Sequence, residues 1–119
     1  MTVLLVEDEP ITRDNLAQQL EWAGLKLVTA TSGKTAMEEL RRRGSHFDAL
    51  VTDLHLGDGI DGAQVAEEME RGYPRARIII MTGRFDLLDM RWQERGWILI
   101  PKPFAAARLV AALRAERPA

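Results

Sequence analysis

The chain contains no cysteine, which excludes disulfide bonds, a thiolate metal site and a cysteine nucleophile. It also lacks an apolar run approaching the roughly 18 residues that span a bilayer, and its first residues lack the basic start and apolar stretch of a signal peptide. Its 16 Lys and Arg residues are outnumbered by 18 Asp and Glu residues, and the net charge of −2 gives no positive field to hold a nucleic acid. We therefore expect a cytoplasmic protein that binds neither a membrane nor a nucleic acid.

The rest of the composition is that of an ordinary globular domain. The 119 residues are 46% apolar and 29% charged, and a chain of this length can bury a substantial core. There is no repeat, linker or low-complexity stretch. We expect a single domain over residues 1–119.

Five short apolar runs, rich in Val, Ile or Leu, alternate with amphipathic segments. The runs are Val3–Val6, Leu25–Ala30, Ala49–Thr52, Arg77–Met81 and Trp97–Ile100. Short and nearly continuous apolar runs are typical of parallel strands that are covered on both faces. They predict the five strands of a parallel sheet.

In the segments between and after these runs, apolar residues recur at helical spacing, and a glycine ends most of the segments. The segments carry Leu16, Leu20 and Ala23 before Gly24; Ala36, Met37 and Leu40, capped by Ser32, before Gly44; Val65, Ala66 and Met69 before Gly72; Phe85–Glu94 before Gly96; and Ala106, Leu109, Val110 and Leu113. Five strand–helix units predict an α/β fold with right-handed crossovers and helices on both faces of the sheet. The doubly wound order 2-1-3-4-5 is favoured, although periodicity alone does not fix it.

Acidic residues leave two of these strands at the edge where such sheets bind ligands. Glu7, Asp8 and Glu9 follow the first run, and Asp53 follows the third. Three carboxylates from Glu7, Asp8 and Asp53 would repel one another unless a cation neutralised them. Few protein ligands, all of them oxygens, suit Mg²⁺. The sequence therefore predicts a magnesium site at this edge.

Two other strands end in groups that complement such a site. Thr82 follows the fourth run, and Lys102 follows the fifth between Pro101 and Pro103, which break the strand and fix its exit. A hydroxyl and an ammonium group beside a metal–carboxylate cluster can bind the equatorial oxygens of a phosphoryl group.

The motifs VLLVEDE, LVTDLHL, IIIMTG and PKPF, in this order and each ending its own strand, resemble the receiver domain of bacterial two-component response regulators. The resemblance covers Val3 to about Glu116 and implies a flavodoxin-like fold. It implies that Asp53 is the phosphoacceptor, that Thr82 is the hydroxyl that moves toward the phosphoryl group, and that Lys102 pairs with that group.

The resemblance also implies a ligand set for Mg²⁺: the carboxylates of Glu7, Asp8 and Asp53, and the backbone carbonyl of His55. The Lys102–Pro103 bond resembles the cis peptide of the family. The implied phosphoryl donor is a histidine kinase or a phosphotransfer protein. The implied output is a switched surface for a downstream protein, formed by the fourth helix and fifth strand, on a monomer or weak homodimer. Such a receiver is a signalling phosphoacceptor that catalyses only its own phosphorylation and dephosphorylation.

The sequence departs from the family at several positions. Gly57 stands where proline is usual, and the loop LHLGDGIDG is one residue longer before Gly62. The loop glycines Gly57, Gly59 and Gly62 are expected to give backbone freedom. Leu99 replaces the usual switch aromatic, and Trp97, two positions earlier, is expected on the same sheet face. We therefore expect Leu99 to stay in place on phosphorylation.

His55 and Arg84 lie two residues after Asp53 and Thr82, at positions that line the route to the phosphoryl group in the family and tune its lifetime. In the fourth helical segment, two apolar stripes lie on nearly opposite sides, which suits either a partner surface or a helix that is buried twice. These stripes are Phe85, Leu88 and Trp92, and Leu87 and Met90.

Two alternative functions remain at this point. A haloacid-dehalogenase-like phosphohydrolase would also place an aspartate, a threonine and a lysine around Mg²⁺, but it requires a second aspartate where this chain has His55. A degenerate receiver that only binds partners is compatible with Leu99. The chain is expected to be either a stand-alone regulator or part of a larger protein such as a hybrid kinase.

Overall fold

In the computed structural model, which describes residues 1–83 and 91–115, five parallel strands form one sheet in the order β2-β1-β3-β4-β5. The strands are β1 (Thr2–Val6), β2 (Lys26–Ala30), β3 (Ala49–Asp53), β4 (Arg77–Thr82) and β5 (Ile98–Pro101). The helices are α1 (Pro10–Trp22), α2 (Gly33–Arg41), α3 (Gly62–Gly72), α4 (Arg91–Glu94) and α5 (Ala106–Arg114). The predicted doubly wound fold and strand order are confirmed.

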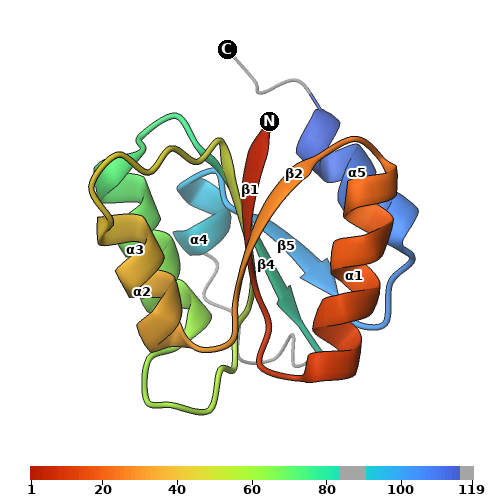
Figure 1. The fold of residues 1–119 in the computed structure, drawn as a ribbon, viewed down its shortest axis with the longest axis horizontal. Coiled ribbons are helices and arrows are strands. Elements are labelled where there is room, and N and C mark those ends of the chain that lie inside the picture. The colour runs from red at the N-terminus through yellow and green to blue at the C-terminus, as the bar shows by residue number, and fades with distance from the viewer. Residues whose placement is uncertain (84–90, 116–119) are drawn as a thin grey trace.

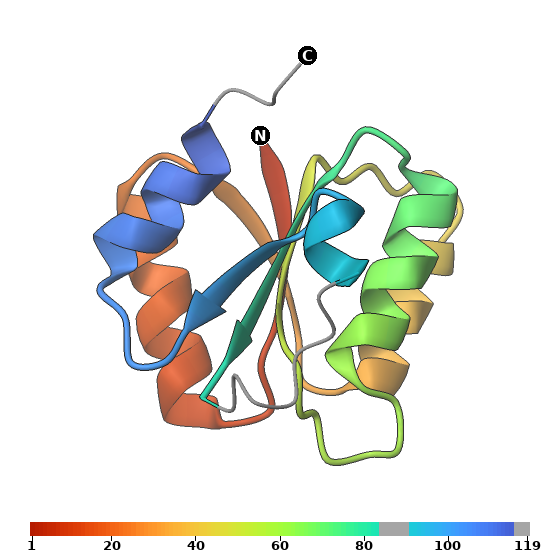
Figure 2. The same ribbon diagram turned by 180° about the vertical axis from the view of Figure 1, so that it is seen from behind.

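The sheet separates two helical layers, with α1 and α5 on one face and α2, α3 and α4 on the other (Figures 1 and 2). The alternation of side chains along the strands divides the core in the same way. Leu4, Leu50 and Ile80 point into the layer of α2 and α3, whereas Leu5 and Val51 point into the layer of α1 and α5. Because both faces are covered, β3 is buried along its whole length.

Two strands begin one residue later than predicted. The N–H of Leu25 donates to the Leu20 carbonyl at 3.2 Å, and the N–H of Trp97 donates to the Trp92 carbonyl at 3.1 Å. In each case the preceding glycine has a positive φ, 90° and 84°, and reverses the chain as the helix ends. Both apolar side chains still pack into the core, which is why the runs looked like the starts of strands.

The helices α2 and α3 are capped at the carboxyl edge of the sheet by polar side chains. The predicted cap Ser32 accepts a hydrogen bond from the Thr35 N–H at 3.1 Å, and Asp61 accepts one from the Gln64 N–H at 2.9 Å. Of the predicted fourth helix Phe85–Glu94, only Arg91–Glu94 lies within the described residues. The stripe residues Phe85, Leu87, Leu88 and Met90 lie outside them. None of the helices described is long and apolar enough to cross a membrane.

Candidate functional site

The three predicted carboxylates converge at the carboxyl edge of the sheet. Glu7 and Asp8 follow β1, and Asp53 is the last residue of the neighbouring strand β3. One carboxylate oxygen from each residue lies within 4.8 Å of the others. The side chain of Glu7 is buried, Asp53 is 9% exposed and Asp8 is open to solvent. The site therefore has a buried floor and an open side through which an ion or substrate can enter.

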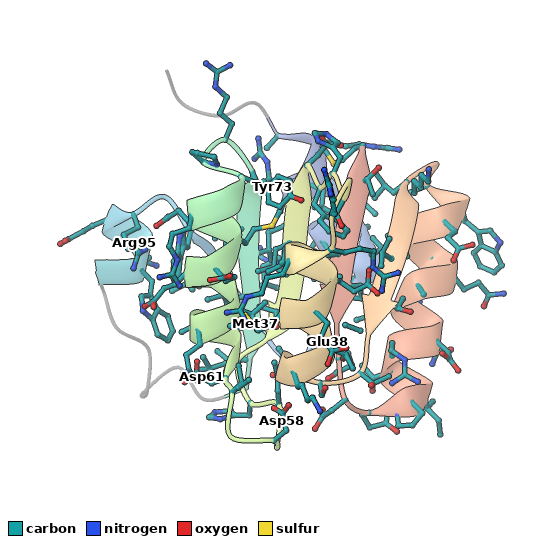
Figure 3. The ribbon with its side chains drawn as sticks, turned by 60° about the vertical axis from the view of Figure 1, so that its left-hand side comes forward. Met37, Glu38, Asp58, Asp61, Tyr73 and Arg95 are labelled. Carbon is teal, nitrogen blue, oxygen red and sulfur yellow. The ribbon has the colours of Figure 1, made fainter. Side chains whose placement is uncertain are left out.

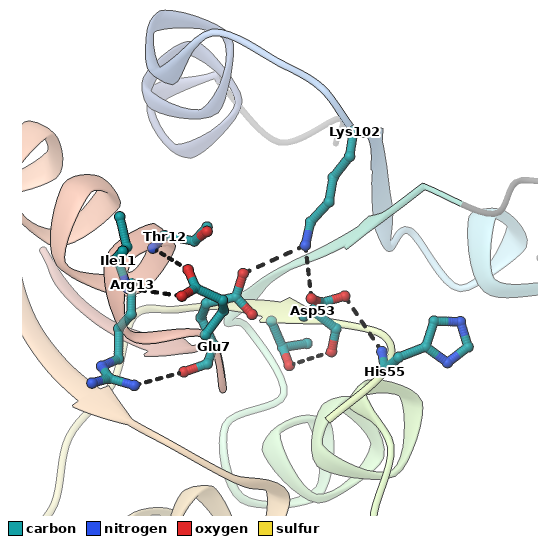
Figure 4. Close-up of polar contacts among 9 residues, drawn as sticks. Glu7, Ile11, Thr12, Arg13, Asp53, His55 and Lys102 are labelled. Atoms are coloured by element: carbon teal, nitrogen blue, oxygen red, sulfur yellow. Dashed lines mark hydrogen bonds and ion pairs between the residues drawn. The ribbon is translucent and has the colours of Figure 1, made fainter. Parts of the chain in front are cut away.

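Lys102 supplies the positive charge that this cluster needs. Its Nζ lies 2.7 Å from Asp53 Oδ2 and 3.4 Å from Glu7 Oε1 (Figure 4). Its backbone N–H donates to the Thr82 carbonyl at 2.9 Å, which joins the ends of β5 and β4. The Lys102–Pro103 peptide is cis, as predicted.

Burial and these contacts shift the pKa values of Glu7 and Lys102. Burial raises the pKa of Glu7 to about 7, with the repulsion of Asp53 adding to the rise and the attraction of Lys102 opposing it. Burial lowers the pKa of Lys102, but its hydrogen bond to Asp53 and the charges of both carboxylates outweigh burial and hold that pKa above its usual value. The lysine therefore stays charged while the buried glutamate resists ionisation.

The donor set fits a hard dication. Glu7 Oε2 is buried and accepts no hydrogen bond from any group within residues 1–83 and 91–115. A buried carboxylate oxygen without a donor is costly, and a bound cation would satisfy it. Three carboxylates facing one lysine also leave an excess of negative charge. Oxygen ligands with one open side suit Mg²⁺, which keeps several of its waters.

The other predicted residues lie around this cluster in different ways. The backbone N–H of His55 points to Asp53 Oδ1 at 3.4 Å, while its side chain is exposed (Figure 4). Thr82 is fully buried at the end of β4. Leu99 is partly buried and, with Trp97, packs into the layer of α2 and α3, so the predicted shared face is confirmed. Arg84 lies outside the described residues.

Gly62 has a different role from the backbone freedom that the sequence suggested. Gly57 and Gly59 do have positive φ angles of 77° and 87°, whereas Gly62 does not. A Cβ on Gly62 would instead lie 2.2 Å from the carbonyl oxygen of Asp53. Gly62 is needed because α3 begins against the backbone of Asp53, and this steric requirement cannot be read from the chain alone.

Two further contacts were not predicted. Glu9, the third acid after β1, is not part of the cluster and caps α1 by accepting a hydrogen bond from the Thr12 N–H at 2.7 Å. Arg13, on the first turns of α1, donates to the Glu7 carbonyl at 3.2 Å (Figure 4). Only the position of a polar residue directly before a helix could have indicated the cap, and nothing in the sequence indicated the contact of Arg13.

Comparison with known families agrees with this geometry. The family model of the response regulator receiver domain matches residues 3–114. The chain belongs to this family. A response regulator receiver protein of Anaeromyxobacter sp. is 31% identical over 109 residues, which are 90% of this chain and 44% of that protein. Sensory transduction protein RegX3 of Mycobacterium tuberculosis is 31% identical over 96% of this chain and 49% of its own length. The chain thus spans about half the length of these relatives.

Solved receiver structures share the fold. A response regulator receiver protein from Sinorhizobium medicae has a TM-score of 0.83 at 31% identity, with 95% of this chain and 90% of that chain covered. The receiver domain of a sensor histidine kinase from Pseudomonas aeruginosa has a TM-score of 0.75 at 28% identity, with 95% and 93% covered, and holds a magnesium ion in its active-site cleft. This domain is therefore a receiver of two-component signalling. The comparisons give no support to a phosphohydrolase or to a degenerate receiver.

Proposed function

We propose that this receiver accepts a phosphoryl group on Asp53 from the phosphohistidine of a kinase or a phosphotransfer protein. The observation that carries the proposal is the position of the Asp53 carboxylate, which lies at the end of a buried strand, 2.7 Å from Lys102 Nζ and within the acidic cluster. A carboxylate oxygen of Asp53 forms the bond to phosphorus as the phosphorus–nitrogen bond of the donor breaks, and the electron pair returns to the donor imidazole. Water later attacks the phosphorus of the acyl phosphate, which releases inorganic phosphate and restores the carboxylate.

The proposed roles of the surrounding residues follow from where they lie. Glu7, Asp8 and Asp53, with the backbone carbonyl of His55, would hold Mg²⁺, which when bound neutralises charge on the phosphoryl oxygens. Lys102 exchanges its contact with the Asp53 carboxylate for one with a phosphoryl oxygen. This exchange leaves the ammonium paired throughout.

Thr82 is the proposed switch hydroxyl, at the end of the strand that pairs with both β3 and β5. The exposed side chain of His55, beside Asp53, and Arg84 are proposed to tune the lifetime of the acyl phosphate. The receiver acts as a signalling phosphoacceptor whose chemistry is confined to its own phosphorylation and dephosphorylation.

The partners are proposed by family resemblance. The phosphorylated form would bind a downstream protein in the cytoplasm through α4 and β5. We propose that residues 1–119 form one receiver domain and that the protein is a monomer or a weak homodimer. The domain could serve alone or within a longer regulator, as it does in relatives of which it spans only part. Sedimentation of the phosphorylated and unphosphorylated forms tests the oligomeric state.

Intact-mass measurement tests the phosphoacceptor. The natural chain, treated with acetyl phosphate and Mg²⁺, should gain the mass of one phosphoryl group, and Asp53→Asn should gain none while keeping its fold by circular dichroism. Asp14→Asn, which alters an exposed carboxylate on α1, should behave as the natural chain does. A phosphoryl group mapped to any other residue would overturn the assignment of Asp53.

A further inference from the structure

The loop between Asp53 and α3 is tied to a helix outside the site by one carboxylate. Asp58 Oδ2 accepts a hydrogen bond from the Lys34 N–H, at the start of α2, at 2.9 Å. Its Oδ1 accepts a weaker one from the Ile60 N–H at 3.4 Å. The bond from Lys34 is the main reason why the pKa of Asp58 lies below its usual value. Figure 3 shows Asp58 at this end of α2, at the opposite end of the molecule from Tyr73.

A second contact presses the same loop against the same helix. A Cβ on Gly33, the first residue of α2, would lie 2.6 Å from Ile60 Cβ and 2.7 Å from the Ile60 carbonyl oxygen. Gly33 therefore packs directly against the side chain and the carbonyl oxygen of Ile60, with no room for a Cβ of its own. Since Ser32 already caps Thr35, Asp58 satisfies a different N–H of the first turn, where the helix dipole favours a carboxylate.

The near end of the loop lies against the acidic cluster. A Cβ on Gly57 would lie 3.4 Å from Asp8 Oδ2, so the backbone at Gly57 borders that carboxylate. Leu56 is buried in the core, and the N–H of His55 reaches Asp53. The loop thus runs from Asp53, past Asp8, to the start of α2.

Asp58 restrains the part of this loop in which the backbone has the most conformational freedom. It stands between Gly57 and Gly59, both of which have positive φ. Glycines have the largest conformational freedom to lose on ordering, so a segment with two of them needs a tether to keep one position. In the described structure, the contact with Lys34 provides this tether.

We infer that Asp58 is a positioning residue for the metal site: through its bond to α2 it holds the backbone of His55 beside Asp53 and that of Gly57 beside Asp8. The inference rests on the proposed function, because it assumes that the acidic cluster binds Mg²⁺. Asp58 itself would not contact the metal. It acts through the loop, as outer-shell partners of metal ligands do when they fix the ligands.

Calorimetric titration with Mg²⁺ alone tests this role without any phosphoryl transfer. Asp58→Ala should raise the dissociation constant for Mg²⁺ about tenfold, the lower end of the effect expected for an outer-shell partner. Asp58→Asn loses the charge but keeps an oxygen that can accept from Lys34, so it should restore most of the affinity. Glu38→Gln removes an exposed charge from α2 and should leave the affinity within about twofold of the natural value.

The outcomes separate this inference from the proposed function. Equal losses in Asp58→Ala and Asp58→Asn would show that charge rather than the tether matters, and would overturn the inference. An unchanged affinity in Asp58→Ala, with Mg²⁺ bound by the natural chain, would overturn it alone. A natural chain that binds no Mg²⁺ would overturn the proposed metal site and the inference together. Circular dichroism of each variant verifies that the overall helix content and the fold are retained.

Discussion

At the scale of single residues, Lys102 already serves two carboxylates before a phosphoryl group arrives. Its Nζ contacts both Asp53 and Glu7, at 2.7 and 3.4 Å. One ammonium group cannot neutralise three carboxylates, and the pKa of Glu7 is raised to about 7, first by burial. Without a metal, the site therefore lacks enough positive charge, and this favours the binding of a cation.

The close approach of Gly62 to Asp53 predicts a strong effect of a single methyl group. Gly62→Ala should lower the free energy of unfolding by about 1–3 kcal/mol, because the new Cβ would overlap the Asp53 carbonyl oxygen and displace the backbone. It should also slow phosphorylation by acetyl phosphate. Urea unfolding and intact mass measure the two effects.

Gly72, the last residue of α3, offers the matched control. A Cβ there would meet no heavy atom within 4 Å, and its φ is not in the positive range. Gly72→Ala should therefore be neutral, or stabilising by up to about 1 kcal/mol through helix propensity. Equal stability of Gly62→Ala and the natural chain would contradict the steric role of Gly62.

At the scale of elements, the carboxylate of Glu70 links α3 to the segment between α4 and β5. Glu70 Oε2 accepts a hydrogen bond from the Trp97 indole N–H at 2.8 Å, and Glu70 also pairs with Arg95. The Arg95 guanidinium lies 4.4 Å from the centre of the Trp97 ring, in cation–π contact. Trp97 itself is buried. This group of three side chains therefore links α3 to the segment that follows α4.

Removal of Glu70 should cost stability because the buried indole N–H would lose its acceptor. Glu70→Ala should lower the free energy of unfolding by about 1–3 kcal/mol, measured by urea titration, and Glu70→Gln, which keeps an acceptor oxygen, should lower it less. Glu67→Ala, at the more exposed partner of Arg95, should have a small effect. A loss in Glu67→Ala as large as that in Glu70→Ala would argue against the indole contact.

The same carboxylate gives a pH dependence with a defined sign. Burial raises the pKa of Glu70, but its bonds to Arg95 and Trp97 outweigh burial and hold that pKa below the usual 4.5. The unfolded state therefore binds the proton first as pH falls, and the stabilisation is complete above about pH 4.5 and lost below it. The stability difference between the natural chain and Glu70→Gln should shrink as pH falls below 4.5. A difference that stays constant from neutral to strongly acidic pH would contradict this.

Leu99, on β5, predicts a switch that does not use an aromatic side chain at this position. Leu99 is partly buried against the layer of α2 and α3 and has no hydroxyl to gain from moving outward. On binding of a phosphoryl analogue at Asp53, we expect Leu99 to keep its place while movement passes through Thr82 and the loop that begins at Gly83. Chemical-shift changes in the analogue complex measure this. Movement centred on Leu99, with residues 83–92 unchanged, would defeat the prediction.

At the scale of the whole molecule, the acidic cluster couples metal binding to stability. Repulsion among Glu7, Asp8 and Asp53 acts on the folded state, because only folding brings the ends of β1 and β3 together. A ligand that binds only the folded state stabilises it in proportion to the logarithm of its concentration. The melting temperature therefore reports the occupancy of the metal site.

Mg²⁺ at ten to a hundred times its dissociation constant should add roughly 1–3 kcal/mol to the free energy of unfolding and raise the melting temperature. Asp8→Asn should remove most of this rise, since it takes away a ligand and a charge. The exposed substitution Asp14→Asn should not. An equal rise in Asp8→Asn would place the metal elsewhere on the molecule.

The sequence by itself determined the α/β class of the fold and which charged residues meet at the carboxyl edge of its sheet. Apolar runs and helical stripes depend only on neighbouring residues, and they sufficed for a parallel sheet whose carboxyl edge gathers Glu7, Asp8, Asp53 and Lys102. The tertiary structure decided the contacts between segments: that Glu9 caps α1, that Gly62 lies against Asp53, that Asp58 reaches α2 and that Trp97 precedes its strand to bond Glu70. These contacts join residues from different elements. How closely such residues approach depends on the packing between the elements, which neither periodicity nor composition specifies.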